Sequence, residues 1–170
     1  MVQSFAAYWF YLRFGVAPAK LGLIFFWANV LAGISALLAS RLATRIGLVR
    51  TMVVTHLPSN VLLILVPLMP NLSLAVLMLL FRFSISQMDV PTRQSYTMAV
   101  VRPEERSAAG GIAGVARTAG AAISPIFAGF LFSRPALIDV PFFIAGTLKI
   151  AYDLVLYREF SAIRPPEEAD

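Results

Sequence analysis

The sequence predicts an all-α, polytopic transmembrane helical bundle, and its composition and the lengths of its apolar runs lead to that fold class. Hydrophobic residues make up 59% of the 170 residues and charged residues 14%, whereas soluble domains average roughly 45–50% and about 25%. The apolar residues gather in runs of about 20, the length that crosses a bilayer as a helix. These runs lack the alternation of barrel strands. A soluble enzyme, a disordered chain and a coiled coil are therefore excluded.

The apolar runs divide into full spans and one partial span. The run at 2–12 is too short to cross, and it has neither the charged n-region nor the cleavage site of a signal peptide. We interpret it as the second half of a span whose first half is missing. We expect one transmembrane half-domain over residues 1–160 and a cytoplasmic tail at 161–170. The predicted full spans are 21–40, 51–69, 72–90, 108–132 and 138–157.

The distribution of basic residues predicts the orientation of these spans. Alternate loops lie on the same side of a membrane, and the second loop, the fourth loop and the tail are the richest in arginine. The positive-inside rule places that side, with the C-terminus, in the cytoplasm of a plasma or inner cell membrane. The net charge of +5 comes from span ends and not from one patch, so nucleic acid is not an expected partner. The basic residues of this side are Arg41, Arg45, Arg50, Arg102, Arg106, Arg158 and Arg164.

Enzyme chemistry is not expected from this sequence. It contains no cysteine and one histidine, His56, which excludes a cysteine nucleophile and leaves little for a metal site. A membrane-embedded enzyme would need a nucleophile with a base, a metal cluster or paired carboxylates, and the acids Asp89 and Asp153 lie on different spans. We expect no cofactor and no metal. His56 lies beside Pro58, and we interpret it as a structural residue rather than a proton carrier.

Several ionisable residues lie inside the predicted spans. A charge at mid-bilayer costs about 2.5–3.5 kcal/mol on insertion scales, so such a group usually faces a bundle interior or a water-filled path. Arg82 and Arg117 lie roughly 15 Å deep at 1.5 Å per residue, and we assign them, with Asn29, to a substrate path. The alternative is that they pair with acids elsewhere. Lys149 and Asp153 stand at i and i+4, and we predict that they form a buried pair.

Two further patterns concern helix ends and helix packing. Asp89 and Arg93 lie about two and three turns beyond Arg82 on one face of the predicted helix. Pro91, which stands between them in the sequence, lacks an N–H and so removes one backbone hydrogen bond near Asp89. We expect a gate or an interhelix latch there. The span 108–132 carries a stripe of small residues, which lets another helix approach closely in lipid. That stripe consists of Gly110, Gly114, Thr118, Ala121, Pro125 and Gly129.

The loop at residues 40–50, SRLATRIGLVR, resembles the G-x-x-x-D-R-x-G-R-R loop of the major facilitator superfamily. Arg45 and Gly47 match that motif, whereas Ser40 and Thr44 replace its first glycine and its acid. The resemblance implies gate or latch roles for Arg45 and Gly47. It also implies a sharp turn at Gly47.

Other segments are similar to the same superfamily. Leu79-Leu-Phe-Arg82 resembles the second-half counterpart of its membrane arginine motif, and Asp89-Val-Pro91-Thr-Arg93 resembles its acid–proline–arginine clusters. The segment GAAISPIFAG resembles its antiporter pattern g-x-x-x-G-P-x-x-G-G, although Ser124 and Ala128 replace two glycines. The helix-packing positions that this last motif implies are Gly120, Ser124, Pro125 and Gly129.

The whole chain except its tail resembles the C-terminal half, helices seven to twelve, of such a transporter. The resemblance implies alternating access around a midplane site between two six-helix halves. The antiporter-like motif implies proton-coupled efflux of a small organic solute, with Asp89 as a weak candidate for the proton carrier. The implied partners are membrane lipid, the solute and a missing N-terminal half. Two alternatives stay open: a small dimerising membrane protein or subunit, and an inert truncated product.

Overall fold

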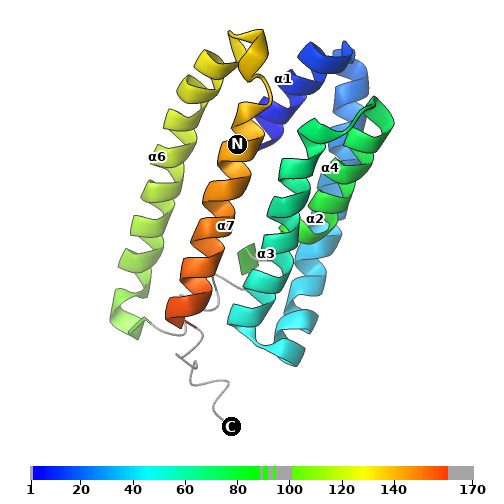
Figure 1. Cartoon of the computed structure of the whole chain (residues 1–170). Coiled ribbons are helices and arrows are strands. Elements are labelled where there is room, and N and C mark those ends of the chain that lie inside the picture. Colours follow the sequence, from blue (N-terminus) through cyan, green and yellow to red (C-terminus); the bar gives the residue numbers. More distant parts are fainter. Residues whose placement is uncertain (1, 89, 92–93, 95–100, 161–170) are drawn as a thin grey trace.

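The computed structural model is a bundle of helices that run up and down side by side (Figure 1). It describes residues 2–88, 90–91, 94 and 101–160. Within these residues the regular structure is helical, without a strand. Four of the described helical segments are long and apolar enough to cross a membrane, by length and composition. The predicted all-α, membrane-type fold class is confirmed.

The helices follow the predicted spans in order. The four segments with spanning length are Pro18–Ile46, Arg50–Leu68, Pro103–Phe132 and Pro135–Arg158. Short 3-10 turns, η1 (Val66–Leu68), η2 (Pro103–Glu105) and η3 (Pro135–Leu137), adjoin the longer helices. Those longer helices are α1 (Val2–Phe14), α2 (Pro18–Ile46), α3 (Leu48–Leu65), α4 (Leu72–Ser86), α6 (Arg106–Phe132) and α7 (Val140–Phe160).

Two helices are shorter than a full span. α1 has 13 residues and starts about midway along the bundle (Figure 1). α4 has 15 residues and ends at Ser86, whereas the sequence predicted one span over 72–90. A turn follows at Gln87 and Met88. Pro91 has no N–H to donate to the carbonyl of Gln87, so one hydrogen bond of a regular α-helix is missing at this point.

Local sequence signals account for the helix ends. Pro18 stands in the first turn of α2, where its missing N–H costs nothing. The side chain of Asn71 caps α4 by accepting a 2.9 Å hydrogen bond from the backbone N–H of Leu74. Gly47 joins α2 to α3 with φ at 87°, in the left-handed region that glycine enters without steric cost. The turn expected at Gly47 is therefore present.

The core lies between α1, α2, α3, α4 and α7. α3 packs most extensively against α7 and α4, and α2 packs against α4. α6 stands at the edge of the bundle (Figure 1), has few contacts with α1 and α7, and is almost entirely exposed. Aromatic and aliphatic side chains fill the interior by burying their apolar surface. The largest buried apolar residues are Trp9, Phe10, Leu63, Leu79 and Phe142.

The connections divide between the two ends of the bundle. The α2–α3 junction at Gly47, the turn η2 and the end of α7 lie at one end (Figure 1). η1 and η3 lie at the other end, with the α1–α2 connection (Figure 1). This up-and-down order brings the arginine-rich connections together at one end, as the sequence predicted. Their cytoplasmic location stays a prediction.

Candidate functional site

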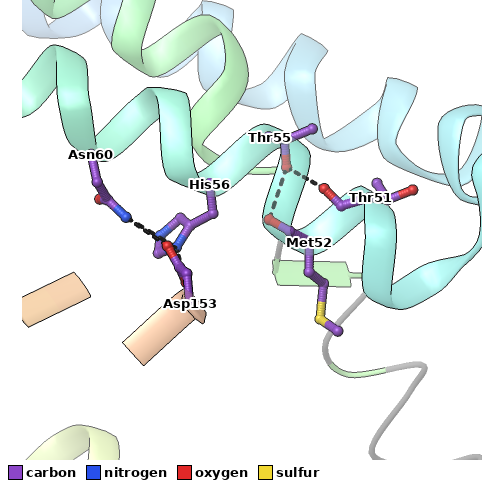
Figure 2. A network of polar contacts seen from close by, with 6 residues as sticks. All are labelled: Thr51, Met52, Thr55, His56, Asn60 and Asp153. Carbon is purple, nitrogen blue, oxygen red and sulfur yellow. Dashed lines mark hydrogen bonds and ion pairs between the residues drawn. The ribbon is translucent and has the colours of Figure 1, made fainter. Parts of the chain in front are cut away.

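A buried polar network joins α3 to α7, and Figure 2 shows its side chains pointing toward one another. His56 Nδ1 on α3 lies 2.8 Å from each carboxylate oxygen of Asp153 on α7. Asn60 Nδ2, one turn along α3, donates a 2.9 Å hydrogen bond to Asp153 Oδ2. The side chains of His56 and Asp153 are only 9% and 4% exposed. Protein donors rather than bulk water therefore surround this carboxylate.

The sequence of α3 places these two donors on one face. His56 and Asn60 are four residues apart, so both project toward the same neighbouring helix. The threonines that precede them bond within their own helix: Thr55 Oγ1 donates to the Thr51 carbonyl at 2.7 Å, and Thr51 Oγ1 donates to the Gly47 carbonyl at 2.7 Å. These hydroxyls are satisfied without α7. The polar contact between the two helices is therefore made by His56 and Asn60.

A close approach of the two helix backbones supports the network. Gly146 lies two turns before Asp153 on α7 and is buried against α3. A methyl group added at Gly146 would overlap the side chain of Ile64 and lie 3.2 Å from the Asn60 carbonyl oxygen. Only a residue without a side chain fits here. Gly146 thus brings α7 near enough for Asp153 to reach His56 and Asn60.

The donor set determines what the network can do chemically. His56 Nδ1 faces both the Asp153 carboxylate at 2.8 Å and the Asn60 Nδ2 at 3.3 Å, and the tautomer of the imidazole decides whether that nitrogen donates or accepts. Asn60 Oδ1 is buried and has no hydrogen-bond partner within the described residues. The site therefore combines two titratable groups with one unused acceptor.

A second polar feature is Arg82, which the sequence assigned to a substrate path. Arg82 is 4% exposed on α4, roughly 15 Å from the start of that helix. Its guanidinium carbon lies 5.2 Å from the centroid of the Phe83 ring, a distance at which a cation and an aromatic face attract. The charge thus lies inside the bundle and away from the exposed surface.

Buried hydroxyl groups occur on the same helices as Arg82 and His56. Within the described residues, the side-chain oxygens of Ser35 on α2, Ser59 on α3 and Ser86 on α4 are buried and make no hydrogen bond. Buried polar groups are normally satisfied by protein or by ordered water. The three helices that carry these hydroxyls pack against each other.

The structure gives the other predicted substrate-path residues a different environment. Arg117 on α6 and Asn29 on α2 are exposed, whereas Arg82 is buried. Asn29 accepts a 2.8 Å hydrogen bond from Gln3 Nε2 and donates one of 2.7 Å to the Phe25 carbonyl. The described chain therefore does not gather the three residues at one place, and their shared role in a path stays a prediction.

Those gate and packing residues whose burial the structure describes are exposed or half-buried. Arg45 is exposed in the last turn of α2, and Pro91 is half-buried. Asp89 and Arg93 lie outside the described residues, so the predicted latch stays a prediction. Gly120 and Gly129 are exposed on α6. Ser124 and Pro125 also belong to this helix.

Asp153 acquires partners that the sequence did not indicate. The sequence analysis paired it with Lys149, one turn away, and that pairing stays a prediction; Lys149 is half-buried. The contacts that the structure shows are with His56 and Asn60, 97 and 93 positions away. The i, i+4 spacing of a histidine and an asparagine on one span was a usable signal for a polar face. That spacing did not indicate which helix the two side chains would contact.

Comparison with known proteins shows which family the sequence resembles. Residues 1–170 match the Major Facilitator Superfamily. The chain is also 29% identical over 157 residues to the "Uncharacterized membrane protein YJR124C" of Saccharomyces cerevisiae, a match that covers 92% of this chain and 35% of that protein. The chain thus spans about a third of the length of that relative. No solved structure matches it significantly.

Proposed function

The chain belongs to the major facilitator superfamily, whose members are membrane transporters, and from this premise we propose that it moves a small organic solute by alternating access as part of a secondary transporter. In such proteins two bundles rock around a site near the membrane midplane. The order of the superfamily-like motifs along the chain supports the proposal that the chain forms the C-terminal half of the transporter.

The observation that carries the proposal is the burial of Arg82. The guanidinium of Arg82 is 4% exposed inside the bundle, and ionisable groups within membrane segments often mark a solute path. It lies on α4, which packs against α2 and α3, and these helices hold the buried hydroxyls of Ser35, Ser59 and Ser86. A buried positive charge on this helix suits a solute with an anionic or strongly polar group.

Proton-coupled efflux is the mode of transport that we propose. It is supported by the antiporter-like segment on α6, from Gly120 to Gly129, and by the buried titratable pair His56 and Asp153. A transporter that exchanges solute for protons needs a titratable group inside the membrane domain. This pair is such a group.

A separate six-helix half is the partner that we propose for the chain. α6 is almost entirely exposed in the described structure, with large apolar side chains such as Ile112, Val115 and Ile126 at its surface. The relative from yeast is about three times as long as the matched segment. A second candidate, assembly of two copies of this chain, rests on the same exposed face of α6.

The test uses the transporter that contains this chain, reconstituted in vesicles that enclose a pH-sensitive dye. A panel of small organic anions, zwitterions and cations is added outside, and solute-driven proton movement is recorded. We expect a response to at least one anionic or zwitterionic solute. Arg82→Ala should abolish that response with little change in the amount of protein in the membrane.

Two variants make the test specific. Arg82→Lys keeps a positive charge but loses the planar fork of donors, so we expect a weakened response. Arg134→Ala removes an exposed arginine at a loop and should leave the response unchanged. If Arg82→Ala transports as well as the unmodified protein, Arg82 is not on the solute path. If none of the solutes moves protons, proton-coupled transport of this class of solute is wrong.

A further inference from the structure

We propose that the outward face shared by α3 and α7 binds an anionic phospholipid, with the phosphate between Arg50 and Arg158 and the acyl chains along the apolar side chains next to them. The two helices pack side by side (Figure 1). The face is separate from the buried Arg82 and from the contact of His56 with Asp153. The proposal rests on two exposed arginines and does not depend on the proposed transport function.

The polar contact inside the helix pair shows that the two arginines lie at nearly the same level. α3 and α7 run in opposite directions (Figure 1), and His56 meets Asp153 between them. Arg50 comes six residues before His56, and Arg158 comes five residues after Asp153. At 1.5 Å per residue these steps are about 9 Å and about 7.5 Å toward the same end. Because packed helix axes are about 8–10 Å apart, one headgroup can reach both guanidinium groups.

Helix geometry also turns the two arginines toward one side of the pair. Successive residues of an α-helix are about 100° apart, so Arg50 lies about 120° around α3 from His56. Arg158 lies about 140° around α7 from Asp153, in the same sense. In an antiparallel pair of helices, the same sense of rotation leads to the same side. Both arginines are exposed, so a molecule that lies against this side meets both of them.

Apolar side chains cover the same side of the pair. Val54 and Val61 of α3 and Leu154 of α7 are exposed. Their positions are between about 100° and about 160° around the helices, measured as for the arginines. They continue from the level of the arginines toward the middle of the spans, where acyl chains surround a membrane helix. The face thus offers apolar contact to the chains of a lipid and positive charge to its headgroup.

The ends of the two helices place the arginines at the depth of lipid headgroups. Arg50 comes three residues after Gly47, where α3 begins, and Arg158 comes two residues before the end of α7. Tyr157 is exposed next to Arg158, and tyrosine is enriched where a membrane meets water. The sequence predicts that this end of the bundle is cytoplasmic, the side on which anionic lipids give a membrane its negative surface potential.

The charge near this face favours an anion. Residues 1–88 contain no Asp and no Glu, so the helices α1 to α4 provide no carboxylate for Arg50. On α7, Glu159 follows Arg158 at a position about 100° further around the helix. A guanidinium group presents a planar fork of donors that matches the oxygens of a phosphate. A headgroup such as that of phosphatidylglycerol supplies the phosphate without a cation, whereas phosphatidylcholine carries its own ammonium group.

The test uses the complete protein that contains this chain, in nanodiscs of phosphatidylcholine. A small amount of phosphatidylglycerol with a diazirine on one acyl chain is added, and illumination attaches it to the residues that it contacts. Mass spectrometry then locates the label. We expect residues 54–61 and 150–157 to be labelled at least about fivefold more by this probe than by phosphatidylcholine with the same diazirine, because basic residues near the membrane surface attract anionic lipid.

Matched variants separate recognition of the headgroup from contact with the chains. Arg50→Gln and Arg158→Gln should each reduce labelling by the phosphatidylglycerol probe about fivefold. Arg50→Lys keeps the charge but loses the planar fork, so it should retain more labelling than Arg50→Gln. Arg41→Gln makes the same chemical change at an exposed arginine of α2 and should leave labelling of the α3–α7 face unchanged. A circular dichroism spectrum equal to that of the unmodified protein shows that each variant is folded.

Three results would overturn the proposal. Equal labelling by the two probes would mean that acyl chains touch the face without recognition of the headgroup. Unchanged labelling in both Arg50→Gln and Arg158→Gln would remove the arginines from the site. Absence of label from this face in the unmodified protein would mean that protein covers it. None of these results depends on solute or proton movement, so the failure of this proposal and the failure of the proposed function are distinguishable.

Discussion

Trp9 Nε1 donates a 2.6 Å hydrogen bond to Asp139 Oδ1, and this bond ties α1 to the residue just before α7. The indole of Trp9 is fully buried. It also packs edge-on against Phe142 in the first turn of α7, with ring centroids 5.1 Å apart. The 13-residue helix α1 is thus held to α7 by one polar bond and by the aromatic contacts of Phe5 and Trp9 with Phe142.

We predict that Trp9→Phe destabilises the protein by about 1.5–2 kcal/mol, because a hydrogen bond to a charged acceptor is lost while an aromatic ring remains. Asp139→Asn keeps an acceptor oxygen and should cost less. Thermal or chemical unfolding in detergent micelles measures both. A loss below about 0.5 kcal/mol for Trp9→Phe would show that the bond contributes little.

We predict that Gly146→Ala destabilises the α3–α7 contact by about 1–3 kcal/mol, because the added methyl overlaps Ile64 in a tightly packed interface. Ile64→Ala should relieve much of that loss in the double variant. Gly22→Ala on α2 is the matched control, since a methyl group there meets nothing within 4 Å. The free energy of unfolding is measured for the unmodified protein, Gly146→Ala, the double variant with Ile64→Ala, and Gly22→Ala. Equal stability of Gly146→Ala and Gly22→Ala would contradict the close approach of α3 and α7 at Gly146.

We predict that Gly47→Ala costs about 1–2 kcal/mol, because φ at this residue is 87° and a Cβ is strained in the left-handed region. Gly33→Ala, in the middle of α2 with open space around it, should be neutral or stabilising. Comparison of their unfolding free energies isolates the effect of backbone conformation. A Gly47→Ala variant as stable as Gly33→Ala would mean that the turn relaxes without strain.

We predict a coupling energy of about 1–3 kcal/mol between His56 and Asp153 in a double-mutant cycle of alanine substitutions, as expected for residues in direct contact. The same cycle for Lys149 and Asp153 tests the pair that the sequence indicated. The measured quantity is the free energy of unfolding of each single and double variant. Strictly additive losses for His56 and Asp153 would show that their contact is not energetically significant.

Sequence reasoning reached the fold class and the order of the helices. The resemblance of the loop at residues 40–50 to the superfamily motif implied the turn that is found at Gly47. It predicted a span over 72–90, within which the structure describes α4 from Leu72 to Ser86 and a turn at Gln87 and Met88. The apolar composition of a run does not predict the residue at which its helical hydrogen bonds end. The pairing of Lys149 with Asp153, taken from their local spacing, stays a prediction.

The sequence by itself determined that this protein is a helical membrane protein with spans in a given order. That much follows because each span must meet the length and polarity of the bilayer within consecutive residues. The tertiary structure alone decided that His56 and Asn60 meet Asp153 across 97 and 93 positions. That contact depends on how far α3 and α7 are rotated and how closely they approach at Gly146. Neither quantity is a property of one segment, so only the packed bundle determines it.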